Sequence, residues 1–266
     1  MDDLELRAEA KSFLRIFELQ EQPIVGQFDV DHLREVHRYI FQDSPQHGPG
    51  NFRQAMPIET PYYKSRMLEA TGYRYNVAYA PSNDLQGSLS SALQEVGGVD
   101  GFQGLNHDQF VSRMAKLYGD LDHIHPFGEG NSRTLRAFTS QLALETGYVL
   151  DWATSKADAL SRDRLYIARD LAVTDRVYPG LDFEKASNTS NKAEYDAYLG
   201  FVAKFNKRDS LEKIIRESSH QLSQQNKLSA HETPYYQAKN MARIRDTMSR
   251  SIEAAKPTLK PLGRKM

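Results

Sequence analysis

The sequence predicts an all-α protein with one small β-hairpin. Apolar residues recur at three- and four-residue spacing along most of the chain, as between Leu33 and Phe41, and this period is typical of amphipathic helices. Strict alternation with a period of two occurs in one place, where Tyr75, Val77 and Tyr79 are separated by Asn76 and a small residue. That alternation predicts a strand, and because it is short and isolated we expect an exposed hairpin.

The helices follow from the apolar period and from the residues that begin and end helices. Asp29 or Asp31 can cap one helix and Asn106 or Asp108 another, and proline or glycine follows most of the periodic segments. The expected helices cover about residues 4–19, 31–41, 82–96, 108–124, 131–146, 154–174, 191–205 and 209–225, with a polar helix and a tail from residue 234 onward.

Composition excludes several classes of function. The 266 residues include 34 basic and 35 acidic side chains, for a net charge of −1, so neither direct nucleic-acid binding nor a membrane surface is expected. The chain has no cysteine, which excludes disulfides and thiolate chemistry. No apolar run reaches the ~20 residues of a membrane span, and the acidic N-terminus lacks a signal peptide. We expect a cytoplasmic protein, with export by a specialised secretion system as the alternative.

One segment, residues 125–136, carries the residues of a phosphate site. Gly128 and Gly130 flank a carboxylate just before a helix that Asn131 or Ser132 could cap. Glycine-rich backbone that enters a helix N-terminus presents N–H donors, reinforced by the helix dipole, to an anion. The segment has neither a Walker A nor a kinase glycine-loop pattern, so a different kind of nucleotide site is indicated.

Charged side chains complete this site. Arg133 and Arg136 lie three residues apart on one helix face and can reach successive phosphates. Glu129 is a hard oxygen ligand for a Mg²⁺ that bridges phosphates, and His125 can take a proton from a hydroxyl near neutral pH. His123 and His125 also have a spacing that zinc sites use, but no third ligand follows at a suitable distance. The sequence therefore predicts a nucleoside-triphosphate site with its own base.

This segment resembles the signature of the Fic family, His-x-Phe-x-Asp/Glu-Gly-Asn-Gly-Arg-x-x-Arg, at seven of its eight specified positions. Residues 50–53, 79–81 and 147–152 are similar to further parts of the family pattern, and the resemblance covers about residues 30–180. It implies a Fic fold in which residues 1–30 form an N-terminal helical extension, 31–180 the core domain and 181–266 a C-terminal helical extension with a tail.

The resemblance also implies an activity, the transfer of AMP from ATP to a Ser, Thr or Tyr hydroxyl of a target protein. His125 would be the catalytic base and Glu129 the Mg²⁺ ligand. Phe127 would anchor the loop in the core. The remaining positions would bind the nucleotide, with the two arginines on the β- and γ-phosphates: Gly128, Gly130, Asn131, Ser132, Arg133 and Arg136. Tyr75, Val77 and Tyr79 would belong to the flap, a hairpin that aligns the target because an extended segment of the target adds to it as a further strand.

Two departures leave alternatives open. Ser132 replaces a glycine of the motif, which keeps phosphate transfer open as an alternative to AMP transfer, and a non-catalytic nucleotide-binding regulator is a third reading. Many family members are silenced by a helix with a Ser/Thr-x-x-x-Glu-Gly/Asn pattern whose glutamate pairs with the second motif arginine. Only Glu129 is followed by Gly or Asn in this chain. We therefore expect no internal inhibitory helix, and a separate antitoxin or none.

Overall fold

The computed structural model describes residues 3–54, 61–81, 83–153, 155 and 157–222. All elements named below belong to one compact unit that ends at Gln221. The polar helix and tail expected from residue 234 onward lie outside the described residues. Among the described helices, none is both long and apolar enough to cross a membrane.

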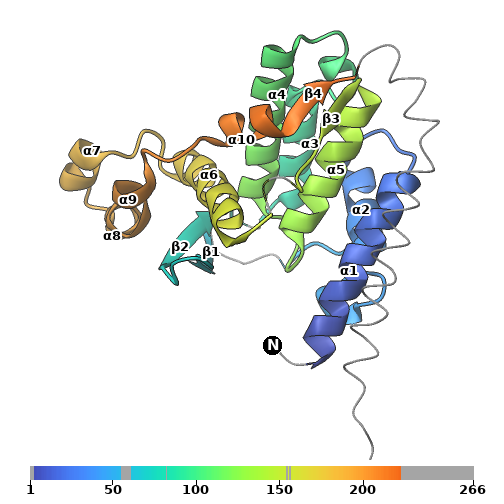
Figure 1. Ribbon diagram of the computed structural model, residues 1–266. Helices are drawn as coiled ribbons and strands as arrows, with labels where there is room; N and C mark the ends of the chain where they lie inside the picture. The colour runs from blue at the N-terminus through green and yellow to red at the C-terminus, as the bar shows by residue number, and fades with distance from the viewer. Residues whose placement is uncertain (1–2, 55–60, 82, 154, 156, 223–266) are drawn as a thin grey trace, which may run out of the picture. The chain divides into compact units, whose positions relative to one another are not determined.

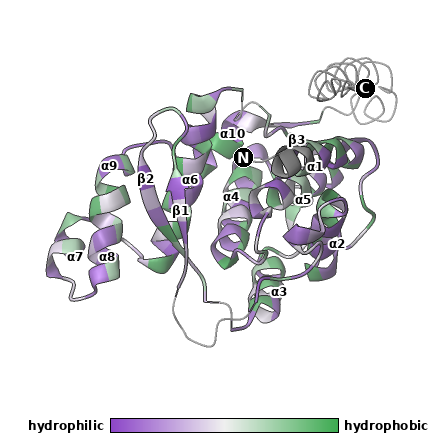
Figure 2. Cartoon of the chain, turned by 90° about the horizontal axis from the view of Figure 1, so that it is seen from below, coloured by the Kyte–Doolittle hydropathy of each residue, from purple (hydrophilic) through white to green (hydrophobic). Residues whose placement is uncertain are grey.

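The first five helices contribute side chains to the main core, as do α6 and α10, which are described below (Figure 1). The first five are α1 (Asp3–Glu21), α2 (Val30–Phe41), α3 (Leu85–Glu95), α4 (His107–Ile124) and α5 (Asn131–Glu145). The long helix α4 packs against α3, α5 and α6, whereas α1 packs against α2 and α5. In Figure 2, hydrophobic residues recur along the helices between hydrophilic ones, as a one-sided burial requires.

The predicted caps are present where these helices begin. Asp29 accepts a hydrogen bond from the backbone N–H of His32 at the start of α2. Asn106 and Gln109 form a reciprocal capping box at the start of α4. Such caps replace hydrogen bonds that the first turn of a helix lacks, and each is worth about 1 kcal/mol. The capping box fixes where α4 begins, and His125, with left-handed backbone, ends the helix at the motif loop.

A second group of elements follows the motif. Helix α6 (Ala159–Val177) packs against α4 and the hairpin, and α7 (Phe183–Asn188), α8 (Lys192–Ala197), a π-helix (Tyr198–Val202) and α9 (Ala203–Phe205) follow it. Figures 1 and 2 both show α7, α8 and α9 on the side of the hairpin away from α1. The last helix, α10 (Leu211–Ser218), packs on α4 and α6. Short 3₁₀ turns occur at Pro45–His47 and Asp100–Phe102.

Two antiparallel two-stranded sheets are present among the described residues. Strands β1 (Tyr62–Met67) and β2 (Arg74–Tyr79) form the hairpin, with Tyr62 opposite Tyr79. Strands β3 (Tyr148–Leu150) and β4 (Ser219–Gln221) form the other. The second sheet was not predicted. It shortens the helix expected at 209–225, because the chain leaves the helix at Ser218 to pair with β3.

The hairpin is also less exposed than expected. The side chains of Tyr75, Val77 and Tyr79 are buried in a second apolar cluster with residues of α6 and the π-helix. The Tyr75 ring stacks on Phe201, with centroids 4.3 Å apart. The hydroxyl of Tyr75 donates a hydrogen bond to Asp170. The alternating residues of β2 therefore form an inward face of the hairpin that helices cover.

Candidate active site

The motif loop joins α4 to α5 through two residues with left-handed backbone. His125 ends α4 with φ 48°, and Gly130 precedes α5 with φ 82°. No side chain caps α5, so its first-turn N–H groups remain for another acceptor. Neither Asn131 nor Ser132 is the N-cap, contrary to expectation, because the turn is made by Gly130. This bare helix N-terminus suits an anionic group.

Internal contacts hold the loop in shape. Phe127 is fully buried, and its ring stacks on His37 at 3.8 Å with an interplanar angle of 5°. The Asn131 side chain accepts from the Phe127 N–H at 2.9 Å and donates to the Phe127 carbonyl at 2.6 Å. Both polar ends of Asn131 are thus engaged with the loop itself. Asn131 therefore shapes the loop, and the expected contact of its side chain with a nucleotide stays a prediction.

Arg53 ties this loop to the hairpin. It donates to the carbonyls of His125 at 2.8 Å and Ala80 at 2.7 Å. Its own backbone N–H donates to the carbonyl of Pro126. Arg53 belongs to the 50–53 turn, one of the segments that resemble the family pattern. The position of the hairpin end relative to the motif loop is therefore fixed by a buried guanidinium.

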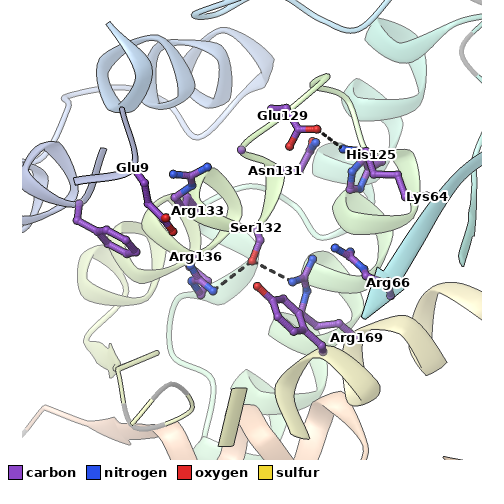
Figure 3. A pocket seen from close by; sticks show the side chains of 13 residues that line it. Glu9, Lys64, Arg66, His125, Glu129, Asn131, Ser132, Arg133, Arg136 and Arg169 are labelled. Carbon is purple, nitrogen blue, oxygen red and sulfur yellow. Dashed lines mark hydrogen bonds and ion pairs between the residues drawn. The ribbon is translucent and has the colours of Figure 1, made fainter. Parts of the chain in front are cut away.

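A polar cavity of about 190 Å³ opens beside the loop. Figure 3 shows side chains from α1, β1, the motif loop, α5 and α6 that point into it. Five of them are cationic and two are acidic, which favours an anionic ligand. The lining residues are Glu9, Phe13, Lys64, Arg66, His125, Glu129, Gly130, Asn131, Ser132, Arg133, Arg136, Tyr166 and Arg169.

Six of the seven positions predicted to bind the nucleotide or the metal line this cavity. Gly128 is the exception, and its carbonyl accepts a hydrogen bond from Lys64 at 2.8 Å. Burial lowers the pKa of both Arg133 and Arg136, although arginine stays charged. Arg136 donates to the Ser132 hydroxyl at 3.1 Å, and Arg133 lies 4.8 Å from the Phe41 ring. Arg136 is buried and Arg133 half-buried, and phosphate oxygens can compensate two such cations that face one cavity.

Glu129 stands at the rim of the cavity with its side chain 62% exposed. Lys64 of β1 donates to its carboxylate at 3.1 Å. In the described part of the chain, no cluster of three His, Cys, Asp or Glu side chains suits a metal. One carboxylate is nevertheless enough for Mg²⁺, which is commonly held by one or two carboxylates and by phosphate oxygens. Glu129 therefore fits a metal that arrives with a nucleotide.

His125 has the properties of a buried neutral base. Its side chain is 4% exposed, and burial lowers its pKa to about 4 despite the nearby Asp122. The Tyr79 ring lies over it, with centroids 3.9 Å apart. An imidazole that is neutral at pH 7 is ready to accept a proton.

The side chains predicted for the flap contact the core instead. Tyr75, Val77 and Tyr79 have at most 5% of their surface exposed, so a bound protein cannot reach these side chains. Tyr79 accepts a hydrogen bond from Arg66 at 2.6 Å through its hydroxyl. The residues of β1 that face the cavity, Lys64 and Arg66, are nearer to the chemistry. Strand addition to the hairpin backbone stays a prediction.

Sequence reasoning missed several residues that line or adjoin the cavity. Lys64, Arg66 and Arg169 add three cations to the two of the motif, and α1 contributes Glu9. Asp122 lies behind His125, one helical turn earlier. Only Asp122 had a local signal, since residues three apart on a helix are neighbours. The others are brought in by tertiary packing.

An internal inhibitory helix would place a glutamate against Arg136, the second arginine of the motif. The hydrogen bond of Arg136 goes to Ser132, and within the described ranges no ion pair joins this arginine to a carboxylate. Glu9 of α1 does line the same cavity, and its charge opposes the lowering of the Arg133 pKa that burial causes. Arg133 also donates to the Ser12 hydroxyl at 2.6 Å. Helix α1 was expected to be only an N-terminal extension of the core domain. It also forms part of the wall of the cavity.

Sequence comparison relates the chain to known proteins. Residues 27–143 match the model of the Fic/DOC family. Protein adenylyltransferase VbhT of Bartonella schoenbuchensis is 30% identical over 159 residues, which cover 60% of this chain and 30% of the relative. The probable protein adenylyltransferase Fic of Escherichia coli K12 is 28% identical over 158 residues, 59% of this chain and 69% of the relative. The chain thus spans less than a third of VbhT.

Solved structures support the fold. The BepC protein of Bartonella tribocorum, a VirB-translocated effector solved with bound AMPPNP, has a TM-score of 0.53 at 17% identity. The alignment covers 83% of this chain and 88% of BepC. The N-terminal Fic domain of a putative cell filamentation protein from Bartonella quintana has a TM-score of 0.52 at 19% identity, over 86% of each chain. The predicted helical fold with a small hairpin is confirmed, and residues 27–143 of this chain are similar to the Fic/DOC family.

Proposed function

We propose that this protein is a protein adenylyltransferase that transfers AMP from ATP to a Ser, Thr or Tyr hydroxyl of a target protein. The observation that carries the proposal is the convergence in one cavity of a neutral buried histidine, the buried Arg136, the half-buried Arg133 and an uncapped helix N-terminus. Relatives of similar sequence are named protein adenylyltransferases, and a protein of similar fold was solved with AMPPNP.

The proposed reaction is a single displacement at the α-phosphorus. His125 takes the proton of the target hydroxyl through a ring nitrogen. The hydroxyl oxygen forms a bond to the α-phosphorus of ATP, and the bond from that phosphorus to the β-bridging oxygen breaks. Pyrophosphate leaves with the electron pair.

The cationic side chains of the cavity bind the phosphates in this scheme. Arg133 holds the β-phosphate and Arg136 the γ-phosphate, while N–H groups at the start of α5 donate to phosphate oxygens. Glu129 holds Mg²⁺, which neutralises phosphate charge when bound. Since Lys64 now pairs with Glu129, this carboxylate already faces a position that suits a cation.

We infer that this protein is cytoplasmic and that a separate antitoxin supplies the inhibitory glutamate. Within the described residues, Arg136 has no carboxylate partner, so an external glutamate could pair with it. Export as an effector is the alternative location, and BepC is described as a translocated effector.

Intact-protein and peptide mass spectrometry of lysate proteins tests the reaction directly. Purified protein is incubated with ATP and Mg²⁺, and the controls are the His125→Ala variant and a sample with EDTA. We expect adenylate on a hydroxyl residue in the complete reaction only. A bare phosphate would replace this proposal with phosphate transfer, the alternative that Ser132 leaves open. Tight ATP binding without any modification in lysates or in producing cells would favour a regulator.

A further inference from the structure

A buried carboxylate lies directly behind the proposed base. Asp122 is on the last turn of α4, and its Oδ1 lies 3.7 Å from Nδ1 of His125. Both side chains are at most 4% exposed. Nδ1 of His125 is buried and has no hydrogen-bond partner among the described residues, and such an unpaired polar atom is costly.

Arg169 of α6 holds this carboxylate in place. Its Nη2 donates to Asp122 Oδ1 at 2.7 Å, and Nε and Nη2 donate to Oδ2 at 3.0 and 2.9 Å. Burial is the largest influence and opposes ionisation of Asp122, but the charges and hydrogen bonds of Arg169 and His125 together outweigh it and lower the Asp122 pKa. Arg169 Nη1 also donates to the Ser132 hydroxyl at 2.9 Å. The carboxylate is therefore ionised and held in place by the hydrogen bonds of Arg169.

One lone pair of this carboxylate remains available to the histidine. A carboxylate oxygen accepts about two hydrogen bonds, and among the described residues Oδ1 has a single donor, Arg169. A hydrogen bond needs a distance about 0.5–1 Å shorter than the present gap. Contacts of this kind are often long in free enzymes and shorten when the substrate binds. A small rotation of the ring would complete it.

We propose that Asp122 is a positioning residue for His125, which accepts a hydrogen bond from Nδ1–H and so leaves Nε2 as the unprotonated nitrogen that faces the cavity. The proposal rests on the adenylyl transfer proposed above, where it specifies how the base is oriented. Arg169 and Ser132 connect this arrangement to Arg136, so the base and one phosphate-binding arginine share a single buried network.

Other groups around His125 do not fix its tautomer. Lys64 and Arg66 of β1 are positive charges that lower its pKa, and burial lowers it further. Tyr79 and Tyr62 contribute rings, 3.9 and 6.1 Å from the imidazole. Of the described groups that face His125, Asp122 alone carries the negative charge that favours a proton on Nδ1.

The tautomer itself gives a test that does not depend on activity. Long-range ¹H–¹⁵N NMR of histidine-labelled protein at pH 7 separates the two forms, and the missing signals of His125→Gln identify the residue. We expect the Nδ1–H form in the unmodified protein and a mixture in Asp122→Asn. Asp120→Asn is the matched control, since Asp120 is on the same helix but pairs with Arg176 at the surface. An Nε2–H form in the unmodified protein would overturn the proposal.

Because Asp122→Asn leaves Arg169 buried without its charge partner, the double variant Asp122→Asn/Arg169→Gln provides a second measurement. It removes both charges, and its tautomer should match that of the single variant. If His125 has the same tautomer in the single and double variants as in the unmodified protein, Asp122 only stabilises the fold, and the proposal is contradicted.

Kinetics then separates this proposal from the proposed reaction. For Asp122→Asn we expect kcat to fall on the order of 100-fold with little change in the KM for ATP. A rise in KM with an unchanged kcat would show a binding role and contradict positioning. If the unmodified protein transfers no adenylate at all, the proposed function fails, while the NMR result still decides whether Asp122 sets the His125 tautomer.

Discussion

Gly130 is the residue of the motif loop where both backbone and space exclude a side chain. Its φ of 82° is left-handed, and a Cβ would lie 2.2 Å from ring atoms of Phe41. Gly128 is two residues earlier, has no left-handed φ and has open space around its Cβ position. The two motif glycines therefore have different roles, although a pattern comparison treats them alike.

We predict that Gly130→Ala destabilises the fold by about 2–4 kcal/mol, because the left-handed backbone and the clash with Phe41 both add to the cost. Gly128→Ala should change stability by less than about 1 kcal/mol. Urea denaturation of both variants measures the difference, and nucleotide titration should show weaker binding for Gly130→Ala alone. Equal effects of the two substitutions would contradict this account of the loop.

The low pKa of His125 has a consequence for the rate. A base works when it is neutral, so activity should fall as pH falls through its pKa of about 4 in the folded protein. We predict that kcat/KM is constant between pH 7 and about 5.5. The fall in kcat/KM that protonation of His125 causes should occur well below pH 6.5, the ordinary pKa of histidine. The measurement is a pH profile on protein shown to be folded by circular dichroism. A fall near pH 6.5 would mean that burial does not control this group.

At the scale of elements, the sequence pattern was most informative where burial is one-sided. The apolar stripe of α2 and the caps of α2 and α4 were predicted because their signals are local. The end of α10 could not be predicted, since Ser219 leaves the helix to pair with Leu150, about 70 residues away. The period of β2 was recognised, but alternation cannot tell which element covers the apolar face.

Helix α1 forms part of the cavity wall, and its Glu9 places a negative charge where we propose that phosphates bind. We predict that Glu9→Gln tightens ATP binding about fivefold, the equivalent of about 1 kcal/mol for a partly exposed charge. Glu145→Gln, on the exposed C-terminal end of α5, is the control. Isothermal titration with a non-hydrolysable ATP analogue measures both. Unchanged affinity in Glu9→Gln would show that this carboxylate does not face the bound phosphates.

At the scale of the molecule, the site divides into a contiguous part and a part assembled by folding. His125, Glu129, Arg133 and Arg136 lie within twelve residues of sequence, so the chemistry of that segment can be predicted from the order of its residues alone. Arg169 comes from α6, and no local spacing relates it to His125. The network that connects these parts depends on α6 packing against α4, and a single sequence does not contain this contact.

The same packing makes the stability of the fold sensitive to acid. Burial lowers the pKa of His32, His37 and His125 in the folded protein, to about 4 for the last two, whereas these residues titrate near 6.5 when unfolded. Below pH 6.5 the unfolded chain therefore binds more protons than the folded one, and stability declines as pH falls toward 4.

For His125 alone, a shift of this size corresponds to on the order of 3 kcal/mol of unfolding free energy, lost progressively between about pH 6.5 and 4. Urea denaturation at pH 7.5, 6 and 4.5 measures the decline. His125→Gln removes one of the contributing groups, so its unfolding free energy should depend less steeply on pH over this range. The unfolding free energy of the two proteins could instead depend on pH with the same slope. His125 would then be protonated equally in the folded and unfolded states, which contradicts a buried base that stays neutral.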